Sequence, residues 1–323
     1  GQQGVREYRW ALGLGLVALV GLYFLGLITA AIVVAAVLVP VVYVMYLYEA
    51  RVYRDAPIPV TLLTIGGGIL VGLIAALVLD PLLASKPVFI DTLQGPVLDI
   101  TALLLVSVVL PLVLEVVKPL PALVLRGRPA FGHSIDGIVF GVAAGLGFAA
   151  AQTIVHYWPV LSRFGVRSEP GLWLLPVVSI AILFPLLHGT TTGLVAGAIW
   201  RLGRAPLSRM ATGAIAAAVL GHIAFALGTQ LLIAASLHAV IVLAWQAIVV
   251  IGLLIAIRLQ LDAALREEAT AEGLTHATCA NCGAAVLAAG FCPACGVAMT
   301  ATSHNASLDA GAAVSGSAPG GAR

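Results

Sequence analysis

The feature that most constrains this chain is its stretch from Trp10 to Tyr48, which contains no charged side chain. As one α-helix this stretch would be about 58 Å long, nearly twice the roughly 30 Å hydrocarbon core of a bilayer. We therefore expect a hairpin of two membrane-spanning helices that turns near residues 26–29. The whole chain is 61% hydrophobic and only 9% charged, against about 25% charged in ordinary globular domains. The predicted fold class is an all-α polytopic membrane protein.

Further apolar stretches bring the prediction to about eight transmembrane helices. We expect Asp80-Pro81 to end the third span and Pro111 to kink the fourth. Lysine and arginine concentrate in alternate loops, so the positive-inside rule places both termini in the cytoplasm. The expected location is the plasma membrane of a prokaryote. After the hairpin, the expected spans are residues 60–79, 100–120, 137–157 and 172–200, with two more from 210–257 that divide near 228–238.

Composition divides the chain into five segments. No signal peptide is apparent, and the sequence opens on Gly1 rather than Met, so we expect its start to be trimmed. The last segment is rich in Ala, Gly and Ser and is expected to be disordered. The predicted segments are a cytoplasmic N-terminus (1–9), an eight-helix membrane domain (10–258), a charged and helical linker (259–276), a small cysteine-bearing domain (277–299) and a disordered tail (300–323).

One acidic side chain, Glu115, lies deep inside a predicted span. An ionised carboxylate at the bilayer centre costs roughly 2.5–3.5 kcal/mol on insertion scales, so such residues are rarely kept without a partner or a function. Lys118 follows on the same helical face and is long enough to reach the carboxylate or the membrane surface. The two residues could form a structural ion pair or belong to an active site.

Three further polar side chains, Gln152, His188 and His222, lie near the middle of later spans. Polar side chains on four successive helices could meet at one point of a bundle. A carboxylate and two imidazoles suit a divalent metal such as zinc, or a hydrogen-bonded site that activates water. Each histidine could equally be a structural hydrogen-bond partner, and Gln152 could join two helices. His156 and His238, near span ends, are expected at the membrane interface.

All four cysteines of the chain form one C-terminal motif, in which Cys279-Ala-Asn-Cys282-Gly is followed by Cys292-Pro-Ala-Cys295-Gly. Two Cys-x-x-Cys knuckles can bind one Zn²⁺ through four thiolates, and the glycines allow tight turns. A redox role is the competing interpretation. The motif resembles the short zinc ribbons of many bacterial membrane proteins, which fold only with metal. Basic and aromatic residues typical of nucleic-acid binding are absent, which favours protein docking.

Several segments resemble a known family. Glu115-Val-Val-Lys118 is similar to the second half of the Glu-Glu-x-x-Lys motif of PrsW-type intramembrane proteases, which are related to the CAAX prenyl endopeptidases. Asp136–Gln152 resembles the next family segment, whose core is Phe-x-x-x-Glu. His188-Gly-Thr-Thr-Thr-Gly193 resembles the histidine-bearing helix, and His222 stands where the family often has a further histidine. The resemblance covers about residues 100–233.

The resemblance implies hydrolysis of a peptide bond within or beside a membrane helix. Glu115 would be the general base or water activator, with His188 and His222 as ligands of a second divalent metal, which Glu115 could also bind, or as oxyanion stabilisers. Lys118 would hold Glu115 or the inner membrane edge, and Gln152 would orient water or the substrate backbone. The implied substrates are membrane proteins in the lipid bilayer.

Two positions favour an alternative function. Leu114 and Gln152 stand where the family pattern has glutamates, and an amide cannot accept a proton as a general base. The alternative is a catalytically silent PrsW-like scaffold or regulatory protein that uses its zinc ribbon for docking. A transporter is a third interpretation, because charges at the membrane midplane also line ion pathways, but no paired inverted halves with broken helices are apparent.

Overall fold

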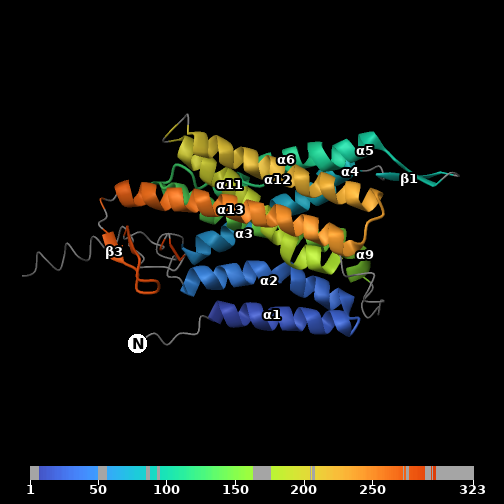
Figure 1. Cartoon of the computed structure of the whole chain (residues 1–323), viewed down its shortest axis with the longest axis horizontal. Coiled ribbons are helices and arrows are strands. Elements are labelled where there is room, and N and C mark those ends of the chain that lie inside the picture. The colour runs from blue at the N-terminus through green and yellow to red at the C-terminus, as the bar shows by residue number, and fades with distance from the viewer. Residues whose placement is uncertain are drawn as a thin grey trace, which may run out of the picture.

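The computed structural model describes residues 7–49, 57–84, 88–92, 95–162, 176–203, 205, 208–271, 273, 276–287, 292, 294 and 295. Long helices run side by side along one axis, and the short strands lie only at the two ends of the bundle (Figure 1). The predicted all-α membrane fold is confirmed. Seven of the described helical segments are long and apolar enough to cross a membrane: Ile28–Tyr46, Ile58–Leu83, Ile100–Leu123, Ser134–His156, Pro176–Leu202, Arg209–Ala234 and Ala239–Glu268.

The predicted N-terminal hairpin consists of helix α1 (Glu7–Phe24) and helix α2 (Ile28–Glu49). Gly26, with φ of 70°, lies in the turn, where its left-handed backbone conformation costs glycine little. Leu19 of α1 packs with Ile32 of α2 in a buried apolar cluster. Helix α1, with 18 residues, is a further long helix beside these seven, which brings the long helices of the described bundle to eight.

Three spans contain a five-residue π-helical segment that ends directly before a Xaa-Pro pair. Proline lacks an N–H and crowds the carbonyl four residues earlier, and the wider π turn accommodates this break. Helix α3 (Ile58–Ile74) continues through η2 (Ala75–Leu79) into α4 (Asp80–Leu83), so the expectation that Asp80-Pro81 ends the third span is wrong. In the second of these spans, η3 (Leu105–Val109) lies between α5 (Ile100–Leu104) and α6 (Leu110–Val117). In the third, η5 (Ser179–Leu183) leads into α11 (Phe184–Leu202).

Helix α8 (Ser134–His156) lies between α11 and α3 and touches both through glycines. A Cβ atom added at Gly145 would lie 2.3 Å from the backbone oxygen of His188 in α11. A Cβ atom added at Gly147 would lie 2.1 Å from the backbone oxygen of Ile65 in α3. Small residues therefore set the separation between α8 and its neighbours, as is common where membrane helices pack closely.

The last two long helices are α12 (Arg209–Ala234) and α13 (Ala239–Ala271). They meet at a turn within the range where the sequence predicted the division. Helix α13 runs without interruption through residues 259–271, which were expected to be a separate linker. Leu265 in this part is buried in an apolar cluster, and Glu267 forms an ion pair with Arg201 of α11 (2.8 Å). The C-terminal part of α13 is thus packed against the bundle.

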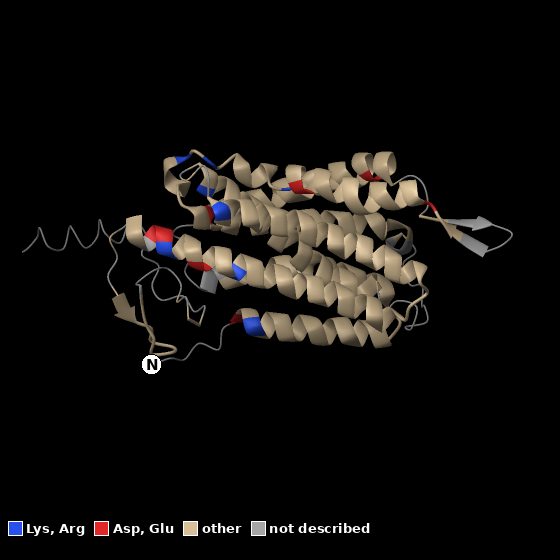
Figure 2. Ribbon diagram, turned by 45° about the horizontal axis from the view of Figure 1, so that its top comes forward, with Lys and Arg blue, Asp and Glu red and all other residues tan. Residues whose placement is uncertain are grey.

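Short elements complete the described chain. Lysine and arginine gather toward the end of the bundle where helix α1 begins and the C-terminal strands lie (Figure 2). The expected tail, residues 300–323, lies outside the described residues. The short elements are α7 (Leu120–Leu123), η4 (Pro129–Phe131), α9 (Trp158–Leu161) and the antiparallel pairs β1 (Phe89–Thr92) with β2 (Gly95–Leu98) and β3 (His276–Thr278) with β4 (Ala285–Leu287).

Candidate active site

The acid at the centre of the sequence prediction is buried and paired with its own lysine. Glu115 lies near the end of α6, and Lys118 directly follows that helix. Their side chains are 3% and 0% exposed, and Lys118 Nζ donates a hydrogen bond of 2.6 Å to Glu115 Oε1. The three-residue spacing places both side chains on one face of the helix. The predicted ion pair therefore exists, deep inside the bundle.

The Lys118 ammonium also reaches α11. Its Nζ atom lies 3.3 Å from His188 Nδ1 and donates a 2.8 Å hydrogen bond to Thr191 Oγ1. An ammonium carries three N–H donors, so Glu115, His188 and Thr191 provide one acceptor for each. Phe148 of α8 lies beside the group, with its ring centroid 5.9 Å from Nζ, close enough for a cation–π contact.

His222 of α12 binds the same carboxylate from the other side. Its Nδ1 atom lies 2.6 Å from Glu115 Oε1. Because an ionised carboxylate only accepts hydrogen bonds, Nδ1 is the nitrogen that carries the proton. The rings of His188 and His222 meet edge to face, with centroids 5.1 Å apart. Glu115, Lys118, His188 and His222 thus converge on one point, and we call these four residues the membrane cluster.

Hydrogen-bond roles fix the tautomer of His188. The Lys118 ammonium can only donate, so His188 Nδ1 is the acceptor and the ring proton sits on Nε2. Glu115 Oε2 and His188 Nε2 are both buried without a hydrogen-bond partner. Buried polar atoms normally have partners. The membrane cluster therefore presents one unsatisfied acceptor, on a carboxylate, and one unsatisfied donor, on an imidazole.

Gln152 belongs to a different polar group. Its Nε2 atom donates a long hydrogen bond (3.5 Å) to Asp80 Oδ2. His156, one turn further along α8, also binds this oxygen through Nε2 (3.1 Å). The structure thus places Gln152 beside Asp80, whereas the sequence grouped it with the four residues of the membrane cluster. Sequence reasoning missed Asp80 because it precedes a proline and was interpreted as a helix end.

The other predicted histidine, His238, lies in the turn before α13, where its Nδ1 atom accepts a hydrogen bond from the Val240 backbone N–H (3.3 Å). This position at the end of a span is the one that the sequence predicted.

The four cysteines come together at the C-terminal end of the described chain. Their sulfur atoms all lie within 4.8 Å of one another, a spacing that can hold a metal ion. The backbone N–H groups of Cys282 and Asn281 donate to the Cys279 sulfur and lower the pKa of its thiol, which favours the metal-binding thiolate. Gly283, with φ of 72°, follows the first knuckle as predicted. Within the described residues, this is the one group of three or more His, Cys, Asp or Glu side chains close enough to share an ion.

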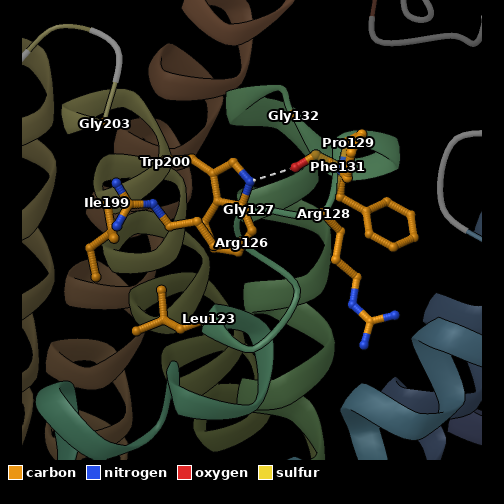
Figure 3. Close-up of a pocket in the computed structure, with 10 residues that line it drawn as sticks. All are labelled: Leu123, Arg126, Gly127, Arg128, Pro129, Phe131, Gly132, Ile199, Trp200 and Gly203. Atoms are coloured by element: carbon orange, nitrogen blue, oxygen red, sulfur yellow. Dashed lines mark hydrogen bonds between the residues drawn. The ribbon is translucent and has the colours of Figure 1, made fainter.

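A surface pocket of about 630 Å³ is lined by residues that include Arg126, Arg128 and Trp200 (Figure 3). It is open to the outside, and none of the four residues of the cluster lines it. Arg126 and Arg128 both line the pocket, but their guanidinium groups point away from each other (Figure 3). The indole N–H of Trp200 is already bound to the Phe131 carbonyl (3.0 Å). The pocket therefore does not bring polar groups together as the membrane cluster does.

Comparison with known proteins assigns the family. The chain matches the family described as PrsW family intramembrane metalloprotease over residues 56–257, more than half of its length. No curated protein and no solved structure matches the chain. The matched region includes the whole membrane cluster, and it agrees with the resemblance seen in the sequence motifs. The chain belongs to the PrsW family of intramembrane metalloproteases.

Proposed function

We propose that this chain is an intramembrane peptidase that hydrolyses peptide bonds of membrane proteins within or near the bilayer. The observation that supports this most is the pair of unsatisfied atoms in the membrane cluster, Glu115 Oε2 and His188 Nε2. One can accept a proton from water, and the other can donate a hydrogen bond to a carbonyl oxygen. Lys118 and His222 hold the other carboxylate oxygen and so orient Glu115.

The proposed reaction proceeds by general-base catalysis. Glu115 Oε2 accepts a proton from a water molecule, whose oxygen forms a bond to the scissile carbonyl carbon. The carbonyl π electrons move to its oxygen, and His188 Nε2–H donates a hydrogen bond to the resulting oxyanion. Glu115 then passes the proton to the amide nitrogen as the C–N bond breaks. The products are an amine and a carboxylic acid, and Glu115 is again a carboxylate.

The family description implies a metal, and the membrane cluster does not fit one in the arrangement described. Catalytic zinc sites use three protein ligands and one open position. In the membrane cluster, Lys118 Nζ lies 2.6 Å from Glu115 Oε1 and 3.3 Å from His188 Nδ1, so an ammonium occupies the space between two of the candidate ligands. The proposed reaction therefore uses the side chains alone.

We infer a second, structural role for the C-terminal cysteines. Four cysteine sulfur atoms within 4.8 Å of one another suit Zn²⁺, which structural sites bind through four protein ligands with no open position. With no open coordination position, such a zinc ribbon would serve for docking to another protein rather than for catalysis. By the positive-inside rule, both termini face the cytoplasm of a prokaryotic cell. The partners proposed are membrane proteins and the lipid bilayer, and not nucleic acid.

Replacing the general base tests the function. We expect Glu115→Gln to reduce cleavage of a co-reconstituted membrane-protein substrate by about 10²–10⁴-fold, because the amide cannot accept the proton. Glu7→Gln is the matched control, since Glu7 is exposed in the first turn of α1 and should leave cleavage unchanged. Undiminished cleavage by Glu115→Gln would refute the proposed reaction.

A catalytically silent scaffold is the second candidate, and the position of Gln152 favours it. Gln152 stands where the family pattern has its second glutamate. Its amide nitrogen lies 3.5 Å from Asp80 Oδ2, so this side chain contributes neither a carboxylate nor an amide to the membrane cluster. If the unaltered chain cleaves no substrate and Gln152→Glu restores cleavage, the scaffold is correct. Cleavage by the unaltered chain excludes it.

A further inference from the structure

We propose that the ammonium group of Lys118 takes the place of a metal ion in the membrane cluster, so that Glu115, His188 and His222 bind no divalent metal. This goes beyond the proposed peptidase function, because it concerns what holds the cluster together and applies whether or not the chain is active. Three observations support it: the saturation of the ammonium, the tautomer of His188 and the number of ligand atoms that remain.

The ammonium is completely coordinated. Its three N–H groups are matched by Glu115 Oε1 at 2.6 Å, Thr191 Oγ1 at 2.8 Å and His188 Nδ1 at 3.3 Å. Lys118 is 0% exposed, so water does not compete for these contacts. A buried cation needs both a countercharge and hydrogen-bond acceptors, and Lys118 has both. The positive charge that neutralises Glu115 is thus already part of the protein.

The tautomer of His188 excludes it as a ligand in this arrangement. To coordinate a metal through Nε2, the neutral ring would carry its proton on Nδ1. That proton would point at the Lys118 ammonium, which lies 3.3 Å away and is itself a donor. With Nδ1 as the acceptor, Nε2 carries the proton and has no lone pair for a metal. Neither nitrogen of His188 is then available.

Too few ligand atoms remain elsewhere in the cluster. Glu115 Oε1 already accepts from both Lys118 and His222, at 2.6 Å each. This leaves Glu115 Oε2 and the second nitrogen of His222, one fewer than the three protein ligands of a catalytic zinc site. A divalent ion would also lie near a buried ammonium, where like charges repel strongly because the interior screens them poorly.

Metal content tests the proposal directly. The full chain is prepared with all four cysteines changed to serine, which removes the ribbon's ligands, and is compared with the same chain carrying His188→Ala or Glu115→Gln. All variants are purified in detergent from cells grown with added Zn²⁺. The number of metal ions per protein chain is then measured by inductively coupled plasma mass spectrometry. The unaltered chain serves as the positive control for metal retention through its four cysteines.

We expect the three cysteine-free chains to contain the same amount of metal, with differences below about 0.1 ion per chain, a tenth of the single ion that one such site would hold. A loss approaching one ion per chain on either substitution would overturn the proposal, since it would show that the membrane cluster holds a metal. Using two substitutions keeps the test valid if one variant folds poorly. Glu115→Gln also separates the two proposals: the peptidase mechanism requires it to lose cleavage, whereas this proposal requires it to keep the same metal content.

Discussion

Glu115 and Lys118 illustrate how a buried charge pair is tolerated inside a membrane protein. The pair is nearly inaccessible to water, and every hydrogen of the ammonium has an acceptor. Taking two charges out of water is costly, and that cost is offset only when the geometry is good and the remaining groups are hydrogen-bonded. Removing one partner should therefore be far more harmful than removing both.

This contrast gives a prediction for Lys118. We expect Lys118→Met to lower the free energy of unfolding by roughly 3–5 kcal/mol, because it leaves the Glu115 charge buried and unpaired. The double variant Glu115→Gln with Lys118→Met should recover part of this loss, since no charge then remains. Unfolding by heat or denaturant in detergent, arranged as a double-mutant cycle, measures the coupling.

The matched control is the ion pair of Arg258 with Asp262, which is more exposed (36% and 23%) and has an N–O distance of 3.4 Å. We expect Arg258→Met to change stability by less than about 1 kcal/mol. Equal effects of Arg258→Met and Lys118→Met would show that the buried pair has no special role in stability.

At the scale of helices, glycines and proline-linked π segments position the membrane cluster. Gly145 lets α8 approach the backbone of α11 at His188. The π segment η3 ends directly before Leu110-Pro111, so Glu115 lies one turn beyond the break. The orientation of both functional side chains thus depends on local departures from regular helix packing.

A pair of glycine substitutions tests this dependence. Gly145→Ala would place a Cβ atom 2.3 Å from the His188 backbone oxygen, so α11 must move. We expect a loss of stability of about 1–3 kcal/mol and reduced cleavage, because His188 moves with its backbone. Thermal unfolding and the cleavage assay measure the two effects.

Gly66 in α3 is the control, because nothing lies within 4 Å of a Cβ atom added there. Gly66→Ala should be neutral or stabilise the helix by up to about 1 kcal/mol, since alanine has the higher helix propensity. A Gly145→Ala variant as stable as Gly66→Ala would contradict the close packing of α8 on α11.

For the whole molecule, the arrangement of the two ends gives a prediction about orientation. The β1–β2 hairpin and the β3–β4 pair lie at opposite ends of the bundle (Figure 1). The only cysteines in the chain are the four near its C-terminus, and Cys282 is exposed. The proposed topology places the C-terminus in the cytoplasm. After a chelator has removed any bound metal, a membrane-impermeant maleimide should therefore label the unaltered chain in inside-out vesicles and not in right-side-out vesicles.

The control uses the opposite end of the bundle. Val97 in β2 is 52% exposed, so Val97→Cys in a chain with the four native cysteines changed to serine should give the reverse labelling pattern. Labelling of both chains from the same side would contradict the inferred topology.

The sequence by itself predicted the membrane class, the N-terminal hairpin, the cysteine knuckles and a set of polar residues that includes the four of the membrane cluster together with Gln152. These follow from local properties: apolar length against bilayer thickness, the cost of a buried charge, and the spacing of metal-binding thiols. Glu115 and His222 could be singled out in this way although 107 residues separate them.

Only the tertiary structure decided which of these residues meet, and how. It placed Lys118 at the centre of the cluster, moved Gln152 to Asp80 and carried α13 past residue 258. The physical reason is rotation about the helix axis. One extra residue in a π segment rotates the rest of the helix by about 100° about its axis. The helical periodicity of the sequence before the segment therefore does not predict which face a side chain occupies after it. Packing against the neighbouring helices determines that face.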